Sequence, residues 1–435
     1  MSATTQILNL NRYDPSGPLP EGRLGTMLAD RQRHAGASSV LVYAQPVEMV
    51  RGEGVWLHGA DGRRYLDTYN NVPSVGHCHP KVAEAIARQA ATLTTHTRYL
   101  NGVVEAYAEK LLATYPAELS NLVMTCSGTE ANDLAMRIAA SGSGRQGFIV
   151  TRAAYHGNSS AVNEISPSAW KSRQPGAHVR LVSAPAGKDP GPSFAAEVAE
   201  AAASLQAAGF GTAALVVDSI FSSDGIYADP AGFIAPAVAA VRAAGGLFIA
   251  DEVQPGFGRT GAALWGFQRH GVTPDIVTMG KPMGNGFPMA GVVTRPELLA
   301  GFCEETGYFN TFGGNPVAAA AGRAVLEVIE EEGLIENARS TGAYFLDGLA
   351  DLASRHARIG GVRGAGLFIG LDFVDAEGAP DTPQTNAVIN ALKDEGILIG
   401  AAGLYGNTLK IRPPLPFTTE NADQFLTTLA GILAR

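Results

Sequence analysis

The sequence is poor in cysteine. Its 435 residues include only Cys78, Cys126 and Cys303, and none of them belongs to a CxxC pair. Their wide spacing and odd number exclude a disulfide framework and a cysteine-based structural metal site. Such usage is typical of a protein from a reducing compartment. We therefore expect no structural metal.

Charge is also scarce. Asp, Glu, Lys and Arg make up 17% of the chain, the net charge is −9, and no long run of Lys and Arg occurs. This balance argues against nucleic acid or an anionic membrane as a partner. No apolar run is long enough and free enough of Gly, Pro and charge to span a bilayer. The first thirty residues lack the basic start and apolar stretch of a signal peptide, so we expect a cytoplasmic protein.

Hydrophobic residues, by contrast, make up 46% of the chain, and glycine occurs 52 times. From about residue 121, short apolar runs alternate with helix-like stretches; these runs read NLVMT, GFIVT, AALVVD, GLFIAD and DIVTMG. This alternation predicts an α/β fold with a mainly parallel sheet covered by helices on both faces.

The length favours one large domain plus a smaller one. We place the large domain at residues 66–320. The N-terminal segment 1–65 contains short strands. The C-terminal segment 321–435 includes most of a long helical stretch, roughly 317–358, and ends with a final helix, roughly 419–434. We expect these two end segments to form a smaller α+β domain together.

The strongest local feature is Lys281, which directly follows the apolar run DIVTMG in the glycine-rich loop TMGKPMGNG. Alone, it would be interpreted as a solvated strand end. Asp251 changes that interpretation because it ends the apolar run FIAD, where open α/β sheets bind ligands. A buried carboxylate needs a cationic partner. A protonated pyridine nitrogen is such a partner, and holding that proton keeps the ring a strong electron sink.

A third element is the strand-to-helix turn in LVMTCSGTE. Small residues at Ser127, Gly128 and Thr129 let backbone N–H groups and a hydroxyl approach a phosphate at the positive end of a helix. Ser and Thr also begin many helices for structural reasons alone. By itself, the segment is equally consistent with a helix cap and with a phosphate cup.

Five motifs occur in one order: SGTEAND, AYHG, ADEVQPGFGRTG, MGKPMGNGFPMAGVV and NTFGGNP. Together they resemble the class III (omega) aminotransferases, which are pyridoxal 5′-phosphate enzymes of fold type I, and the likeness covers essentially the whole chain. It implies that the large domain binds this cofactor, with Lys281 as the Schiff-base lysine and Asp251 as the partner of the pyridine nitrogen. Thr311 matches a phosphate ligand supplied by the other subunit, so we expect a homodimer or a dimer of dimers.

The same resemblance implies the other cofactor contacts. Gly128 and Thr129 match the phosphate-binding pair. Tyr155 matches the aromatic residue that stacks on the ring, with Val253 against the other face. Gln254 matches the residue that bonds the ring oxygen.

In isolation, several of these residues have plainer interpretations. Val253 would be ordinary core, Gln254 a surface amide, and Tyr155 a loop residue bonded to nearby backbone. The surrounding motifs reverse these interpretations. We interpret His156 as structural, together with the two histidines of GHCHP, whose spacing would suit a metal that the family context does not require.

Two positions depart from an ordinary class III transaminase. Such enzymes carry Glu-Pro after the strand that here reads AALVV, whereas this sequence has Asp218-Ser219. They also place an arginine shortly before Pro-Pro-Leu, where it clamps a substrate carboxylate. By the register of that tripeptide, Lys410 occupies the arginine position. The exchange is not conservative, because lysine is a point charge that serves a phosphate equally well.

These departures resemble the phospho-lyase branch of the family, which acts on O-phosphoethanolamine and phosphohydroxylysine. The segments NNV (70–72), TRYL (97–100) and LKIRPP (409–414) resemble it too. We therefore hypothesise a lyase that eliminates phosphate and ammonia from a small phosphorylated amine to give an aldehyde, with Lys410 and Arg98 as candidates for the substrate phosphate.

Two other functions stay open. An omega-aminotransferase would move an amino group from an amine or omega-amino acid to a keto acid, and it alone would need that acceptor. A cofactor-binding regulator without activity is disfavoured because Lys281 and Asp251 are both retained.

Overall fold

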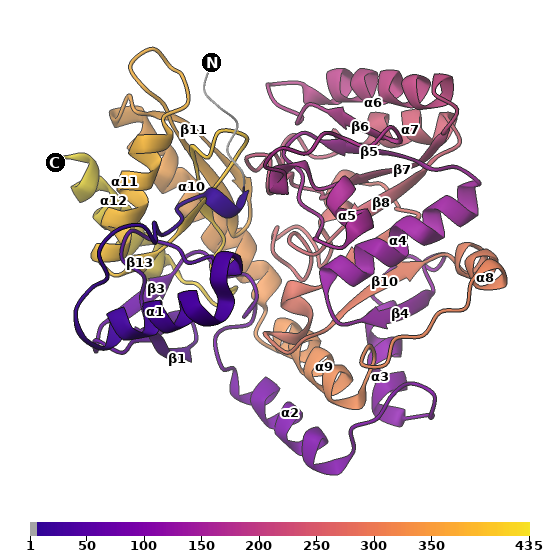
Figure 1. Cartoon of the computed structure of the whole chain (residues 1–435), viewed down its shortest axis with the longest axis horizontal. Coiled ribbons are helices and arrows are strands. Elements are labelled where there is room, and N and C mark those ends of the chain that lie inside the picture. Colours follow the sequence, from indigo (N-terminus) through magenta and orange to yellow (C-terminus); the bar gives the residue numbers. More distant parts are fainter. Residues whose placement is uncertain (1–6) are drawn as a thin grey trace.

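The larger lobe of the molecule is built on a seven-stranded sheet. The computed structural model describes residues 7–435, and Figure 1 shows this sheet in one of two lobes. The strand order is β4-β10-β9-β8-β7-β5-β6; β10 is antiparallel to both of its neighbours, and the other pairs are parallel. The strands are β4 (Asn121–Thr125), β5 (Gly147–Thr151), β6 (Val179–Val182), β7 (Thr212–Val217), β8 (Leu247–Asp251), β9 (Ile276–Met279) and β10 (Ala290–Thr294).

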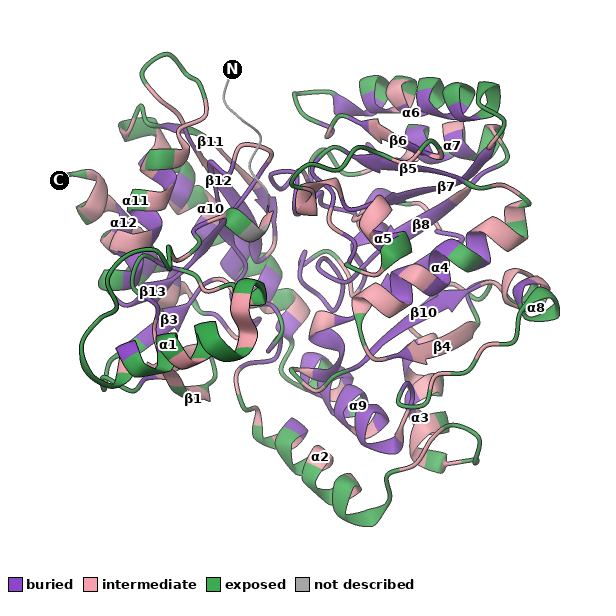
Figure 2. Ribbon diagram, in the orientation of Figure 1, coloured by how far each residue is buried: buried purple, intermediate pink, exposed green. Residues whose placement is uncertain are grey.

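Helices cover both faces of this sheet because its central strands are apolar on both faces. Successive residues of a strand point to opposite sides. In β7, Val216 belongs to the core formed with helix α4 (Gly128–Ser143), whereas Val217 belongs to the core formed with α6 (Pro190–Ala207) and α7 (Ala235–Ala243). Figure 2 shows the central strands buried, the edge strand β4 partly buried and the outer sides of the helices exposed.

The smaller lobe joins segments from both ends of the chain. One four-stranded sheet has the order β1-β2-β3-β13, and β13 pairs with β3 in parallel. A second has the order β11-β12-β15-β14 and is antiparallel throughout. The strands are β1 (Met49–Glu53), β2 (Trp56–Gly59), β3 (Arg64–Asp67), β11 (Ile359–Ala365), β12 (Phe368–Phe373), β13 (Ile397–Leu398), β14 (Gly400–Ala402) and β15 (Thr408–Ile411).

The long helical stretch expected at 317–358 is two helices, α9 (Pro316–Glu331) and α10 (Leu334–Arg355). Gly333 separates them with φ of 61°, a left-handed conformation that ends the first helix. The final helix, α12, spans Thr419–Leu433 as expected. The other helices are α1 (Gly22–Ala35), α2 (Pro80–Thr92), α3 (Gly102–Leu112), α5 (Ser160–Glu164), α8 (Pro296–Glu305) and α11 (Thr382–Asp394), with short 3-10 turns η1 (Ile7–Asn9), η2 (Gly36–Ser38), η3 (Pro167–Ala169), η4 (Gly266–His270) and η5 (Lys281–Gly284).

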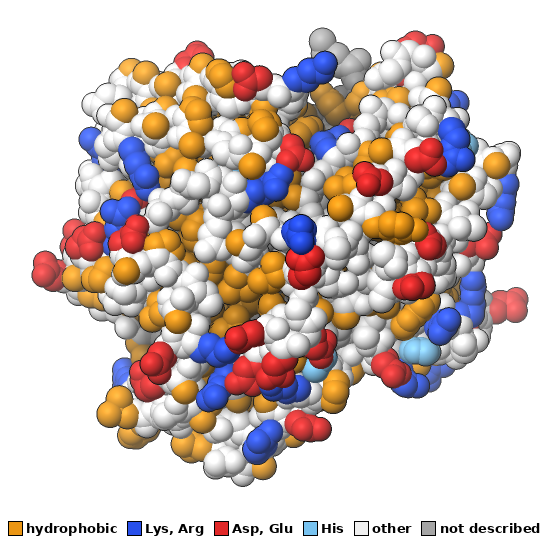
Figure 3. All heavy atoms as spheres, turned by 180° about the vertical axis from the view of Figure 1, so that it is seen from behind, with side chains coloured by type: hydrophobic (Ala, Val, Ile, Leu, Met, Phe, Trp, Pro, Cys, Tyr) orange, Lys and Arg blue, Asp and Glu red, His pale blue; other side chains and the backbone are white. Residues whose placement is uncertain are grey.

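The surface carries both signs of charge. On the face shown in Figure 3, acidic and basic side chains are interspersed, and apolar side chains gather near its middle. Among residues 7–435, no helix has the length and apolar character needed to cross a membrane. The cytoplasmic location and the domain limits at residues 65 and 320 stay predictions.

Candidate active site

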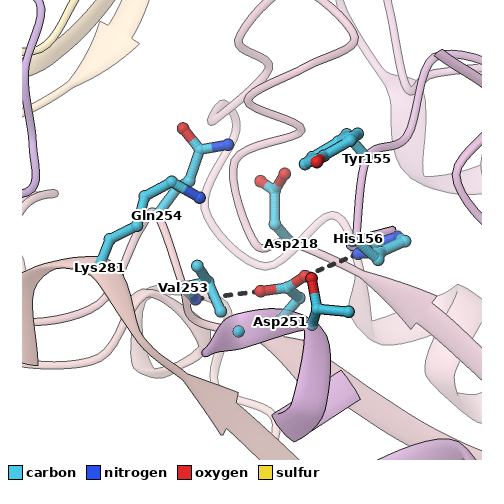
Figure 4. A pocket seen from close by; sticks show the side chains of 10 residues that line it. Tyr155, His156, Asp218, Asp251, Val253, Gln254 and Lys281 are labelled. Atoms are coloured by element: carbon cyan, nitrogen blue, oxygen red, sulfur yellow. Dashed lines mark hydrogen bonds and ion pairs between the residues drawn. The ribbon is translucent and has the colours of Figure 1, made fainter. Parts of the chain in front are cut away.

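Three neighbouring parallel strands deliver polar side chains to one cavity of about 150 Å³. Asp218 follows β7, Asp251 ends β8, and Lys281 lies just beyond β9. The carboxyl ends of these strands meet at one edge of the sheet, where open α/β folds bind ligands. Figure 4 shows the side chains around the cavity. It is lined by Gly128, Thr129, Tyr155, His156, Gly157, Asp218, Asp251, Val253, Gln254 and Lys281.

Asp251 lies at the bottom of the site with only 4% of its surface exposed. Its Oδ1 accepts from the backbone N–H of Val253 at 3.0 Å, and its Oδ2 accepts from Asn132 Nδ2 at 3.0 Å and from His156 Nδ1 at 2.7 Å. Burial alone would raise the pKa of Asp251, but the bond from His156, its charge and the other donors hold it below the ordinary value. The carboxylate therefore stays ionised and can hold a proton on a ring nitrogen.

His156, which the sequence led us to interpret as structural, lies in the site. The structure places it in the cavity wall, buried, with Nδ1 on Asp251 and with Nε2 lacking a partner among residues 7–435. Its position next to Tyr155 is the one sequence feature that pointed to the site.

Lys281 begins the short turn η5 after β9. Burial, followed by the positive charge of Arg412, lowers the pKa of Lys281 to about 8, while Asp251 and Asp218 oppose that shift. Across the described residues 7–435, no hydrogen bond or ion pair engages its ammonium. The uncharged amine is the form that condenses with an aldehyde. A pKa of about 8 gives Lys281 a larger uncharged fraction near neutral pH than an ordinary lysine has.

The start of α4 forms the opposite end of the cavity. Ser127 caps the helix by accepting from the N–H of Glu130 at 3.2 Å, so Gly128 and Thr129 are left to line the cavity. A Cβ on Gly128 would lie 3.1 Å from Cγ2 of Val253, which makes glycine the residue that fits. Ser127 therefore caps α4, and the positive N-terminal end of the same helix faces the cavity.

Three predicted residues surround the middle of the cavity. Figure 4 shows Tyr155 and Val253 facing it from different sides, with Gln254 beside Lys281. Val253 and Gln254 are buried, and burial raises the pKa of the Tyr155 hydroxyl. The amide oxygen of Gln254 accepts from Arg412 Nη1 at 2.6 Å. An aromatic face, an aliphatic face and an amide edge suit a flat aromatic ring.

Asp218 also lines the cavity, although sequence reasoning noted it only as a departure from Glu-Pro. Its carboxylate accepts from the N–H groups of Ile220 and Ser222, both at 3.0 Å, and from the hydroxyl of Ser222 at 2.9 Å. Burial is the first cause that raises the pKa of Asp218.

Lys410 stands on β15, 3% exposed, and does not line the cavity itself. Its Nζ lies 5.5 Å from the ring centroid of Phe368, and within residues 7–435 no acid forms an ion pair with it. Burial and then the charge of Arg412 lower the pKa of Lys410 well below its ordinary value, whereas Asp218 and Asp224 raise it. Lys410 is therefore a buried amine close to the site, and burial without an acidic partner among the described residues disfavours its charge.

Arg98 and Thr311 lie outside the cavity of their own chain, and both are exposed. The guanidinium of Arg98 is 4.2 Å from the ring centroid of Phe309, two residues before Thr311. The structure thus brings seven predicted residues together and leaves these two on the surface, where they lie near each other.

The cavity residues fit pyridoxal phosphate. An ionised carboxylate lies at the bottom, a lysine with a lowered pKa stands beside it, and a helix begins with a glycine that a side chain would crowd. These features match a protonated ring nitrogen, an aldehyde and a phosphate, respectively.

Comparison with known proteins identifies the family. The aminotransferase class-III family model matches residues 38–433, so the chain belongs to that family. It is 42% identical over 419 residues to alanine–glyoxylate aminotransferase 2-like from Drosophila melanogaster, covering 91% of this chain and 84% of that protein. It is 37% identical over 434 residues to ethanolamine-phosphate phospho-lyase homolog 1 from Caenorhabditis elegans, covering 94% and 93%.

Among solved structures, the chain is similar to a phospholyase from Arthrobacter in complex with phosphoethanolamine. The two are 45% identical with a TM-score of 0.91, and the match covers 94% of this chain and 99% of the other. These findings confirm the fold type I architecture, the class III family and pyridoxal phosphate as the cofactor. The protein is an enzyme of this family.

Proposed function

We propose that this enzyme is a phospho-lyase that eliminates phosphate and ammonia from O-phosphoethanolamine, or from a similar amino-alcohol phosphate, to give an aldehyde. The observation that carries the proposal is the buried amine of Lys410, which has no acidic partner within residues 7–435 and stands close to Lys281. The likeness to the Arthrobacter phospholyase, a structure containing phosphoethanolamine, supports it.

Lys410 suits a phosphate for electrostatic reasons. A buried ammonium without a counter-ion is unfavourable, and an incoming anion offsets that cost. Arg412, which is 8% exposed, adds a second positive charge beside it. A dianionic phosphate stabilises the protonated form of Lys410 beside Arg412 better than a single carboxylate does.

The residues of the site divide the reaction between them. Pyridoxal phosphate, when bound, would supply a carbonyl group for the substrate amine and a ring that accepts electrons. Lys281, as the neutral amine, removes the proton from the carbon that carries nitrogen. The electron pair of that C–H bond becomes a double bond to the next carbon as the C–O bond to phosphate breaks. Phosphate leaves with the electrons of the C–O bond, and water converts the resulting enamine to aldehyde and ammonia.

The other residues hold this arrangement. Asp251 keeps the proton on the ring nitrogen, and Tyr155 and Val253 hold the ring between them. Gly128 and Thr129 bind the cofactor phosphate. Because the cofactor has this separate phosphate cup, Lys410 is free to serve the phosphate of the substrate.

The proposal includes a homodimer. Thr311 and Arg98 share an exposed surface with large apolar side chains, among which Leu100 is 95% exposed and Phe312 is 71% exposed. A twofold contact through this surface buries these side chains and carries Thr311 and Arg98 towards the site of the partner. Sedimentation of the holoenzyme should show a dimer or a dimer of dimers at assay concentration, and an active monomer would contradict this.

A class III aminotransferase is the second candidate. The specific observation in its favour is the 42% identity to a protein named for alanine–glyoxylate transamination. With no leaving group on the substrate, the same lysine would return the proton to a carbon of the cofactor. The amino group would then stay with the cofactor until a keto acid takes it. Substrate positioning decides between the two outcomes.

One assay separates the two candidates. The purified holoenzyme is given a panel of amino-alcohol phosphates, and released phosphate and amino-group transfer to pyruvate or 2-oxoglutarate are measured side by side. We expect phosphate, aldehyde and ammonia in equal amounts without added keto acid. Transfer without phosphate release across the panel would replace the lyase by the aminotransferase.

A further inference from the structure

Arg412, just beyond β15, contacts two distant parts of the chain, the segment of residues 69–71 and Gln254 in the cavity wall. Its Nη1 donates to Oε1 of Gln254 at 2.6 Å and to Oδ1 of Asn71 at 2.8 Å, and its guanidinium carbon lies 4.6 Å from the ring centroid of Tyr69. Arg412 is only 8% exposed, and no acidic residue among residues 7–435 forms an ion pair with it. Two amide oxygens are thus the acceptors of a buried, unpaired charge.

The contact with Arg412 fixes which way the amide of Gln254 faces. Because Oε1 accepts from Arg412, the NH₂ group points the other way. Figure 4 shows the nitrogen of Gln254 turned towards the side where Tyr155 and Asp218 lie, with the oxygen turned away. The ring oxygen of the cofactor is an acceptor, so only this orientation gives it a donor.

The charge of Arg412 also reaches Lys281. After burial, it is the next cause that lowers the pKa of Lys281 to about 8. Asp251 and Asp218 face Lys281 and oppose the shift, and Lys410 is the other cation near it. Within the described part of the chain, residues 7–435, no acid binds Arg412 directly, so its charge acts on these neighbours without local compensation.

We propose that Arg412 is a positioning residue for the cofactor: it turns the amide nitrogen of Gln254 towards the ring and places an unpaired positive charge behind Lys281. This inference rests on the assignments of Lys281 and Gln254 made under the proposed function. It does not depend on whether the enzyme is a lyase or an aminotransferase.

The test uses three variants and a control. Arg412→Met removes the charge and the donors, Arg412→Lys keeps the charge but not the planar donor set, and Gln254→Leu removes only the amide. Arg358→Met is the control, because Arg358 is a surface residue paired with Asp381 and its loss changes net charge equally. Two quantities are measured: the pH dependence of cofactor capture by the full-length apoprotein, and the visible absorbance of the holoenzyme against pH.

Capture of the aldehyde needs neutral Lys281. In Arg412→Met the midpoint of capture should move up from about pH 8, and a rise of about one pH unit lowers the capture rate at pH 8 about fivefold. Arg412→Lys should keep the wild-type midpoint but change the holoenzyme spectrum in the same direction as Gln254→Leu. The control should change neither quantity.

A purely structural role predicts a different pattern, in which thermal stability falls but neither the midpoint nor the spectrum moves. That result for a folded Arg412→Met protein would overturn the inference. If Arg412→Met does not fold, a wild-type spectrum in Arg412→Lys beside an altered one in Gln254→Leu would overturn it. Borohydride reduction followed by peptide mapping separates the two failures, because a label on a lysine other than Lys281 would refute the site assignment itself.

Discussion

Nδ1 of His156 lies 2.7 Å from Oδ2 of Asp251, and both side chains are buried. The contact ties the loop after β5 to the end of β8. Asn132 donates to the same carboxylate oxygen at 3.0 Å and accepts from the hydroxyl of Thr278 at 2.8 Å, so the carboxylate is held by a connected set of donors. This set keeps Asp251 ionised although burial opposes its charge.

Replacing Asp251 by Asn should leave the cofactor bound but lower kcat by about a hundredfold or more, because the ring nitrogen loses the group that keeps it protonated. The measurement is kcat at saturating substrate beside the visible absorbance of the protein. A variant that turns over at nearly the wild-type rate would refute the role of Asp251.

Replacing His156 by Phe should have a smaller effect with a definite sign. Loss of the hydrogen bond and charge lets burial raise the pKa of Asp251, so the carboxylate protonates at higher pH. The acid limb of the kcat profile should therefore move to higher pH, with kcat falling about tenfold. His34→Phe, on the exposed side of α1, is the control and should leave the profile unchanged.

Lys281→Ala should abolish activity and the visible absorbance of the bound cofactor, whereas Lys188→Ala, an exposed lysine, should retain both. In the wild type, the base form of Lys281 increases as pH rises through about 8. The rate of proton removal should rise over the same interval and then level off. Rate measurements with substrate deuterated at the reacting carbon isolate this step, and a rate that falls between pH 7 and pH 9 would contradict the assignment.

Lys410→Met should raise KM for the phosphorylated amine by about tenfold or more while leaving cofactor affinity unchanged, because the buried cation meets the substrate and not the cofactor. Lys171→Met, at an exposed position, is the matched control. Lys410→Arg should instead improve the use of carboxylated amines, since a planar fork matches a carboxylate. Equal losses of cofactor and substrate affinity in Lys410→Met would show that Lys410 only supports the fold.

Two helical glycines should respond to alanine with opposite signs. At Gly342 in α10, a Cβ would lie 2.3 Å from backbone atoms of Gly366, so Gly342→Ala should lower the free energy of unfolding by about 1–3 kcal/mol. At Gly301 in α8, a Cβ would meet no heavy atom of residues 7–435 within 4 Å apart from its chain neighbours and its own helix backbone, so Gly301→Ala should raise the free energy of unfolding by about 0.5–1 kcal/mol. Denaturant unfolding of both holoenzyme variants gives the comparison, and a change of the same sign in both would contradict the packing described.

The strands and the residues at their ends could be predicted from the sequence because each is a local pattern. An apolar run followed by Asp251, or by a glycine-rich loop with Lys281, needs no knowledge of distant contacts. The contact of His156 with Asp251 spans 95 residues, and that of Arg412 with Gln254 spans 158. Neither leaves a trace in local spacing, so both appear only when the chain is folded.

Other differences have equally specific causes. The sequence predicts one helix through Gly333, because the helical periodicity continues past it and a single glycine is tolerated inside many helices. In the structure Gly333 adopts φ of 61° and separates α9 from α10. The register of Pro-Pro-Leu singles out Lys410 as a substrate-phosphate candidate, which stays a prediction, but its burial depends on the pairing of β15 between β12 and β14. Whether Thr311 serves a partner subunit stays a prediction.

The parallel pairing of β13 with β3 has a consequence for synthesis. Strand β3 is made early, at residues 64–67, but its neighbour arrives about 330 residues later, as the bond from Thr68 to Leu398 shows. On the ribosome, all residues that line the cavity, from Gly128 to Lys281, emerge while one edge of the first sheet still lacks its neighbour. Until residues 397–398 have been translated, that edge of the nascent chain therefore stays unpaired and open to pairing with another strand.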